Sequence, residues 1–218
     1  KVPDTWVAAA RAADLVVVPS EWSRDAFTNS GLDPKLIMVV PHGVWVTSPS
    51  WRDRNLKRPE VYLHVSGSLS FAARKGTSTL LRAWAEFAKD GQCLWLKMPH
   101  TEGLTRVLKE LNLGDSVRVI ADESYTPRQM IELLQRVDVV VQPSRAEGFG
   151  MVPLEARCLG TPAVLTNATG HQQHYTPLCD TLIRTGRLAP LDTQGNSVGR
   201  APTMTVDDVL HGLHHIDN

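Results

Sequence analysis

The chain has 218 residues, of which 42% are hydrophobic, so it can bury one ample core in one domain or at most two. Its 23 basic residues balance 23 acidic ones, which argues against a global field that would attract nucleic acid or an anionic membrane. Three scattered cysteines suit neither a disulfide framework nor a structural zinc site, so a reducing cytoplasm is the expected location. No apolar run approaches the roughly 20 residues that cross a bilayer.

Short apolar runs recur along the chain and predict buried, parallel strands. These runs are Leu15–Val18, Leu36–Val40, Val61–Val65, Leu94–Lys97, Val117–Ile120, Val137–Val141 and Ala163–Thr166. Between them, apolar residues at helical spacing predict helices over Ser23–Asn29, Thr77–Lys89, Thr105–Leu111, Pro127–Arg136 and Val152–Leu159. The alternation of strands and helices predicts an α/β fold with a doubly wound parallel sheet.

The organisation of the chain follows from its composition. The stretch Trp45–Glu60 is polar, contains two prolines and is interpreted as a linker. It divides the chain into residues 1–58, with the first two predicted strands, and residues 59–218, the main domain. Between Thr185 and Thr205 the pattern dissolves into Gly, Pro, Thr and Asn, and no regular element is predicted there. A helix over Val206–Ile216 closes the chain.

The most informative segment is Pro143–Glu155, which follows a predicted strand and opens a helix. Gly148 and Gly150 let the backbone approach a ligand, and the unpaired N–H groups at the helix start offer donors to an anion such as a diphosphate. Glu147 and Glu155 can both point toward the carboxyl edge of the sheet, where ligands bind in open α/β folds. The alternative is that both glutamates are ordinary solvated residues in salt bridges.

The whole phrase Pro-Ser-x-x-Glu-Gly-Phe-Gly-x-x-x-Leu-Glu-Ala, followed by Leu-Gly-Thr-Pro-Ala-Val, resembles the large family of retaining glycosyltransferases with the GT-B fold. That family includes sucrose, trehalose and glycogen synthases and bacterial mannosyltransferases. Further matching segments occur in the same order, at Asp14–Ser20, Val40–Gly43, Arg74–Gly76 and Val137–Asp138. The resemblance implies that the chain is the C-terminal, Rossmann-like half of a GT-B fold, which binds a nucleotide-sugar donor.

The resemblance also implies roles for individual residues. Glu147 is expected to contact sugar hydroxyls, and Lys75 to stabilise the charge that develops on the departing diphosphate, which makes these two the expected catalytic residues. The amides of Gly148, Phe149 and Gly150 are expected to contact the sugar and the phosphate.

Other donor-binding residues are inferred from the positions that they occupy in the family's pattern. Glu155 is expected to hold the ribose, and Ile120 lies where relatives meet the nucleobase through backbone groups, which leaves the base open. The family usually has Gly-Arg after its first strand of this domain, whereas this chain has Gly67-Ser68. Arg74 either replaces the missing arginine or is a solvated loop residue.

Histidines offer two further candidate sites. His171 lies in a loop near the donor in relatives, and it is either a sugar or phosphate contact or an ordinary polar loop residue, with His174 a weaker candidate. His211, His214 and His215 share a predicted helix, but no carboxylate or cysteine cluster accompanies them, so no metal site is predicted.

The implied activity is transfer of a sugar, typically a hexose, from a nucleotide-diphosphate sugar to an acceptor hydroxyl with retention of configuration. No Asp-x-Asp occurs in the chain, so we expect no cofactor and no obligatory divalent ion. The GT-B architecture also needs an N-terminal acceptor domain, whose first strands have no counterpart here, so that domain is expected in cis or in trans. Since the chain begins with Lys rather than Met, it is expected to be a fragment.

Three alternatives remain beside this interpretation. The chain is a non-catalytic nucleotide-sugar-binding or regulatory module, one subunit of a split glycosyltransferase, or a GT-B relative such as a nucleotide-sugar 2-epimerase. The Glu147-to-Glu155 phrase argues against the epimerase. Nucleic acid is not an expected partner, because the charge is balanced and the basic run Arg52–Arg58 lies in the polar linker.

Overall fold

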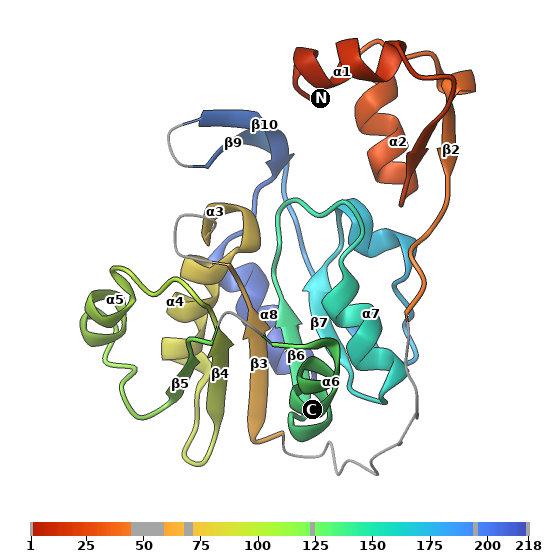
Figure 1. The fold of residues 1–218 in the computed structure, drawn as a ribbon. Helices are drawn as coiled ribbons and strands as arrows, with labels where there is room; N and C mark the ends of the chain where they lie inside the picture. Colours follow the sequence, from red (N-terminus) through yellow and green to blue (C-terminus); the bar gives the residue numbers. More distant parts are fainter. Residues whose placement is uncertain (1, 45–58, 68–71, 123–124, 194–195, 217–218) are drawn as a thin grey trace.

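The structure is a computed structural model that describes residues 2–44, 59–67, 72–122, 125–193 and 196–216 (Figure 1). Residues 45–58 of the predicted linker and Ser68, where relatives carry an arginine, lie outside the described residues. None of the described helices is long and apolar enough to cross a membrane.

The main sheet contains six parallel strands in the order β5-β4-β3-β6-β7-β8. Their bounds are β3 (Val61–Val65), β4 (Cys93–Lys97), β5 (Val117–Ile120), β6 (Val139–Gln142), β7 (Ala163–Thr166) and β8 (Asp180–Ile183). This order confirms the predicted doubly wound sheet. It also places the point where the strand order reverses between β3 and β6, which is where such sheets form a crevice for ligands.

Helices cover both faces of this sheet, and the alternation of side chains along each strand explains why (Figure 1). Tyr62 of β3 packs with one cluster and its neighbour Leu63 with the other. The first cluster includes side chains of α4 (Thr77–Phe87), α5 (Leu104–Glu110) and α8 (Val206–Ile216). The second includes side chains of α6 (Pro127–Arg136) and α7 (Met151–Cys158).

A smaller unit precedes the main sheet and forms the red and orange part of Figure 1. It comprises α1 (Asp4–Arg11), β1 (Val16–Val18), α2 (Glu21–Thr28), the 3-10 helix η1 (Pro34–Leu36) and β2 (Ile37–Val39). Its two strands pair with each other in parallel and join no strand of the main sheet. The division at residue 58 stays a prediction.

The prediction of an irregular segment over Thr185–Thr205 is wrong. An antiparallel hairpin of β9 (Leu188–Thr193) and β10 (Asn196–Pro202) lies there, with a register shift between Ser197 and Arg200. Pro190 and Pro202 lie opposite Arg200 and Leu188 in its ladder. Main-chain hydrogen bonds can stabilise a short two-stranded hairpin without a run of β-branched residues. The residue composition of this segment therefore does not predict the hairpin.

Five further elements are absent from the sequence prediction. They are α1, the 3-10 helix η1, β8, the short helix α3 (Ala72–Lys75) and the 3-10 helix η2 (Thr169–Gln173). Each is short or carries few apolar residues at regular spacing, so periodicity gives little signal.

Candidate functional site

Two loops meet at the reversal point of the main sheet. One follows β3 and ends in α3 and Gly76, and the other follows β6 and runs to Gly150. Gly76 has φ of +72°, and a Cβ there would lie 2.1 Å from the carbonyl oxygen of Pro143. Only glycine permits this approach, which brings the residue before it, Lys75, against the loop after β6. The loops are also joined where the Arg145 amide donates to the Arg74 carbonyl at 2.7 Å.

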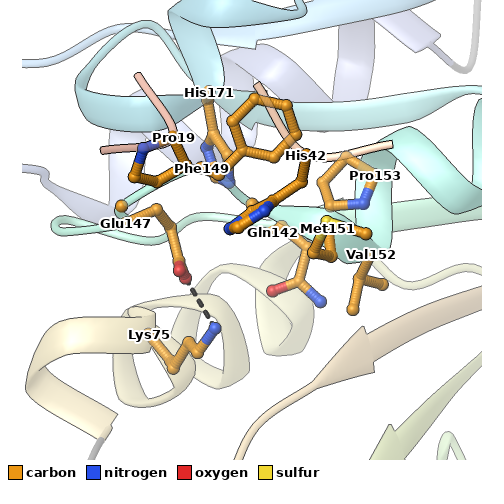
Figure 2. Close-up of a pocket in the computed structure, with 12 residues that line it drawn as sticks. Pro19, His42, Lys75, Gln142, Glu147, Phe149, Met151, Val152, Pro153 and His171 are labelled. Carbon is orange, nitrogen blue, oxygen red and sulfur yellow. Dashed lines mark hydrogen bonds and ion pairs between the residues drawn. The ribbon is translucent and has the colours of Figure 1, made fainter. Parts of the chain in front are cut away.

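An ion pair connects these loops, and it consists of the two residues predicted to be catalytic. Lys75 Nζ lies 2.6 Å from Glu147 Oε1, and Figure 2 shows the two side chains facing each other. Arg74 Nη1 lies 3.5 Å from Glu147 Oε2 and donates to the Ala146 carbonyl at 3.0 Å. Burial raises the pKa of Glu147, but the charge and hydrogen bond of Lys75, with Arg74 and His171, outweigh burial and hold the pKa below its usual value. Glu147 is therefore ionised at neutral pH.

A cavity of about 310 Å³ lies beside this pair. Its walls come from the smaller unit, α3, β6, the loop after β6, the start of α7 and η2 (Figure 2). The residues that line it are Pro19, His42, Lys75, Gln142, Glu147, Gly148, Phe149, Gly150, Met151, Val152, Pro153 and His171. Six of the nine predicted site residues therefore surround one cavity. We call it the first cavity.

The start of α7 faces the first cavity through Gly150 and Met151. No side chain caps this helix end, so the N–H groups of its first turn are available as donors toward the cavity. Gly150 has φ of +89°, and a Cβ there would lie 2.4 Å from Cδ2 of His171. The glycine thus permits both the backbone turn and the close approach of the histidine.

His171 is not a solvated loop residue, because only 1% of it is exposed. Burial, the largest cause, lowers its pKa to about 4, so the ring is neutral at pH 7. The Thr166 hydroxyl donates its one proton to the Ser144 carbonyl at 2.6 Å, so it must accept from His171 Nδ1, which lies 3.1 Å away. Nε2 of His171 is therefore an unprotonated acceptor, suited to a ligand hydroxyl rather than to a phosphate oxygen.

His174 orients the glycine-rich loop, a role that its sequence position did not reveal. Arg157 donates to His174 Nδ1 at 3.1 Å, so Nε2 carries the proton and donates to the Phe149 carbonyl at 2.9 Å. Arg157 itself is held 2.6 Å from the buried carboxylate of Asp180. Since C=O and N–H point in opposite directions in a trans peptide, this chain of contacts turns the Gly150 N–H away from His174.

Residues of the smaller unit fix the position of the Gly148 carbonyl. It accepts hydrogen bonds from the hydroxyls of Ser20 and Ser23, at 2.6 and 3.2 Å. The ring of His42 packs edge-on against Phe149, with centroids 5.3 Å apart. The two units therefore jointly fix the conformation of the glycine-rich loop.

Gln142 is a cavity residue that the motif analysis missed. Only 2% of it is exposed, and its Nε2 donates to the Val65 carbonyl at 3.3 Å, which fixes the amide orientation. Its Oε1 is buried and accepts no hydrogen bond within the described part of the chain. A buried polar atom without a partner is costly, and Gln142 lines the first cavity, so a ligand hydroxyl that reached this oxygen would remove that cost.

Three predicted site residues do not line the first cavity. Arg74 lines a neighbouring cavity together with Glu147 and Gly148. Glu155 lies on α7, where burial raises its pKa, and Ile120 ends β5, at the carboxyl edge of the same sheet. No group of three His, Cys, Asp or Glu side chains in the described ranges could hold a metal ion.

Comparisons with known proteins identify the family of the chain. A family model described as "Glycosyl transferases group 1" matches residues 50–177. The D-inositol 3-phosphate glycosyltransferase of Rhodococcus jostii is 31% identical over 170 residues, which are 72% of this chain and 38% of that protein. The corresponding enzyme of Nocardia farcinica is 31% identical over 175 residues, with 74% and 39% covered. The chain thus spans about two fifths of the length of these relatives.

Solved structures share the fold. A complex of the Anabaena protein HepE with UDP and glucose has a TM-score of 0.68 at 23% identity, covering 83% of this chain and 52% of that one. Sucrose-phosphate synthase of Thermosynechococcus elongatus has a TM-score of 0.71 at 20% identity, covering 98% and 52%. These likenesses show the GT-B type of fold. The matched family model, which covers more than half of the chain, and the fold that these structures share establish that this chain belongs to the glycosyl transferases group 1 family.

Proposed function

We propose that this chain binds a nucleotide-diphosphate sugar and forms the donor-binding portion of a glycosyltransferase that acts with retention of configuration. The main observation in support is that one cavity, at the reversal point of the sheet, is surrounded by Lys75, Glu147, the glycine-rich loop and the uncapped start of α7. The cation and the amides suit a diphosphate, and the carboxylate suits sugar hydroxyls. That HepE was solved with UDP and glucose supports this assignment.

In the proposed reaction, the bond between the anomeric carbon and the diphosphate oxygen breaks, and the oxygen keeps the electron pair. The acceptor oxygen then forms a bond to the same carbon from the same face, and its proton passes to the departing diphosphate. Lys75 and the α7 amides stabilise the negative charge of the leaving group. Glu147 and Nε2 of His171 hold the sugar through its hydroxyls. A hexose is the proposed sugar, and no divalent ion is required.

Donor binding requires Lys75 and Glu147 to separate, so that each of them contacts a part of the donor instead of the other. In the empty site these side chains neutralise each other at 2.6 Å. A diphosphate competes for Lys75 while a sugar hydroxyl replaces Lys75 at Glu147, so both charged groups keep a partner throughout. Ile120 and Glu155 are proposed to meet the base and the ribose from the same edge of the sheet.

The acceptor domain is the proposed partner, in the same polypeptide or in another. The small sheet exposes four apolar side chains, which are Leu15, Val17, Met38 and Val40. An apolar face of this kind commonly marks a packing surface. The cytoplasm is the proposed location, since the three cysteines are unpaired.

Calorimetric titration tests the donor site. UDP, GDP, ADP and their glucose and mannose conjugates are titrated into the full protein and into its Lys75→Ala and Glu155→Ala variants. One nucleotide is expected to bind, and each substitution is expected to weaken its binding by about 1–3 kcal/mol, the range for a lost charged hydrogen bond. Lys109→Ala, which removes an exposed lysine on α5, is the matched control and should change nothing.

The outcomes separate the proposed function from its alternatives. Absence of binding by every nucleotide contradicts the donor site. Tight donor binding without sugar transfer to any acceptor by the full protein would instead support a non-catalytic binding module.

A further inference from the structure

Thr169 has a backbone conformation that its residue type disfavours. It opens η2 with φ of +59°, and Asn112 is the only other non-glycine residue with a positive φ in the described part of the chain. Asparagine tolerates this left-handed conformation, whereas a side chain branched at Cβ makes it unfavourable. Thr169 is also only 1% exposed. Strain of this kind persists only where the surrounding contacts outweigh it, so the contacts of Thr169 identify what the strain achieves.

These contacts converge on Glu147, the residue proposed to hold the donor sugar. The Glu147 amide donates to Thr169 Oγ1 at 3.3 Å. The amide of the next residue, Gly170, donates to the Glu147 carbonyl at 2.9 Å. Both backbone hydrogen-bonding groups of Glu147 are therefore bound by two consecutive residues of the loop after β7.

The close approach of two loops explains why the backbone turns at Thr169. The Thr166 hydroxyl donates to the Ser144 carbonyl, so the loop after β7 contacts the loop after β6 already at its start. At Gly170 a Cβ would lie only 2.4 Å from the Phe149 amide nitrogen. The left-handed turn at Thr169 lies between these two contacts. It directs both its own hydroxyl and the following amide toward one residue of the other loop.

A fixed backbone matters at Glu147 because its carboxylate has to change partners. In the empty site Glu147 Oε1 lies 2.6 Å from Lys75 Nζ, and the side chain is only 11% exposed. When a diphosphate takes Lys75, the carboxylate must already face the sugar hydroxyl that replaces the lysine. A side chain on a fixed backbone loses less conformational entropy in this step than one on a mobile loop.

We propose that Thr169 is a positioning residue for the donor sugar: its hydroxyl fixes the backbone of Glu147 and thereby directs the carboxylate at the sugar. This inference rests on the proposed function, in which Glu147 contacts sugar hydroxyls. Thr169 lines neither the first cavity nor its neighbour, so it acts through Glu147. A glycine at this position would relieve the strain, but it would supply no hydroxyl.

Three substitutions in the full protein separate the strain from the positioning. Thr169→Ala removes the hydroxyl and keeps a Cβ, Thr169→Gly removes both, and Thr169→Ser keeps the hydroxyl. Because glycine accepts a positive φ, Thr169→Gly should have a Tm about 2–4 °C above that of Thr169→Ala. Affinity should group the variants differently. By calorimetry, the Kd for UDP-glucose should rise about tenfold in Thr169→Ala and Thr169→Gly alike and change little in Thr169→Ser, while the Kd for UDP stays unchanged in all three.

Amide hydrogen exchange reports the same contact without any ligand. In the free protein, exchange at the Glu147 amide should be about tenfold faster in Thr169→Ala and Thr169→Gly, because both lose the acceptor of that amide, and it should be retained in Thr169→Ser. Asn112→Gly is the matched control. It replaces the other left-handed residue, at an exposed position after α5, and should change neither this exchange rate nor either Kd.

The outcomes distinguish this inference from the proposed function. If affinity for UDP-glucose follows the Tm, so that Thr169→Gly retains it and Thr169→Ala loses it, Thr169 has only a structural role and the inference is wrong. Unchanged exchange at the Glu147 amide in both variants would also overturn it. If exchange changes as expected but the wild type does not bind UDP-glucose, Thr169 fixes Glu147 as inferred, and the assignment of this donor fails instead.

Discussion

Two side chains at this site each combine a hydrogen bond within the fold with a second polar atom that still needs a partner. Gln142 donates to Val65 and leaves its Oε1 buried beside the first cavity, and His171 uses Nδ1 for Thr166 and directs Nε2 toward Gly150. Both acceptors are held in place before any ligand arrives. A fixed acceptor loses little conformational entropy on binding, so these contacts favour a specific pattern of ligand hydroxyls.

The unpaired oxygen of Gln142 leads to a prediction in which stability and binding change separately. Gln142→Met removes a buried acceptor without a partner, a group that costs about 1–3 kcal/mol, but it also removes the donor to the Val65 carbonyl. We expect the free energy of unfolding in urea to change by less than about 1 kcal/mol. We expect affinity for the sugar nucleotide to fall by about tenfold, measured by calorimetry.

A matched variant makes this comparison decisive. Gln142→Glu keeps the shape and an acceptor oxygen but introduces a buried charge at the cavity that Glu147 also lines, so it should lose stability as well as affinity. An unchanged affinity in Gln142→Met would contradict a role for this side chain in ligand binding.

The loop between β6 and α7 contains two glycines, and the absence of a side chain matters for a different physical reason at each. At Gly150 the φ of +89° and the contact with His171 leave no room for a Cβ. At Gly148 an added Cβ would meet only ordinary van der Waals contacts, the nearest being Ser23 Oγ at 3.8 Å. Gly150 is therefore needed by the fold, whereas Gly148 is not, and its missing side chain matters at the wall of the first cavity instead.

Alanine substitutions at these two glycines distinguish a requirement of the fold from a requirement of sugar transfer. Gly150→Ala is expected to destabilise the protein by about 2 kcal/mol or more, because it combines a left-handed backbone conformation with overpacking. Gly148→Ala should change stability by less than about 0.5 kcal/mol. It should nevertheless slow sugar transfer, because its methyl group would be added at the wall of the first cavity, where the donor sugar is proposed to bind. Thermal unfolding and initial transfer rates measure the two effects, and equal destabilisation by both variants would contradict this assignment.

At the level of elements, sequence signals worked where they were local. Helix α6 begins at Pro127 as predicted, because Thr126 and Gln129 form a capping box, and α8 also has its predicted bounds. The hairpin β9–β10 was missed, because its prolines and glycines are typical of loops and its pairing depends on register rather than on composition.

The site shows the same limit. The glycine-rich loop, Lys75 and Glu147 were found from their motif, and the structure places them around one cavity. The chain from Asp180 through Arg157 and His174 joins residues on three elements, so only the fold brings it together. Glu155 and Ile120 lie away from the first cavity, since a motif records which residues recur and not which wall of a cavity they form.

Across the whole molecule, polar groups buried in the main domain link the site to global stability. His64 lies beneath the Lys75 turn, with Nδ1 2.8 Å from the Val141 carbonyl and Nε2 2.9 Å from the Thr77 hydroxyl. Burial lowers its pKa to about 4, as it does for His171. Both rings are neutral in the folded protein at every pH above about 5, whereas in the unfolded chain they titrate near pH 6.5.

This difference predicts how stability depends on pH. A histidine whose folded pKa is depressed contributes stability that is fully present above its unfolded pKa and is lost as pH falls toward its folded pKa. The window is therefore about pH 6.5 to 4. Between pH 7 and pH 5, His64 and His171 should each cost the folded state about 2 kcal/mol. Between pH 7 and pH 5 Glu147 adds little, because its unfolded pKa of 4.5 lies below this range and its folded pKa is lower still.

Urea unfolding at pH 7, 6 and 5 measures this loss, and His171→Gln isolates one half of it. The glutamine is polar and does not titrate, so the variant is expected to be less stable than the wild type at pH 7 but to lose about 2 kcal/mol less stability than the wild type between pH 7 and pH 5. A variant that loses as much as the wild type would mean that His171 titrates normally and is not buried as a neutral ring. Since the same neutral ring supplies the Nε2 acceptor of the first cavity, that result would also remove His171 from the proposed sugar contacts.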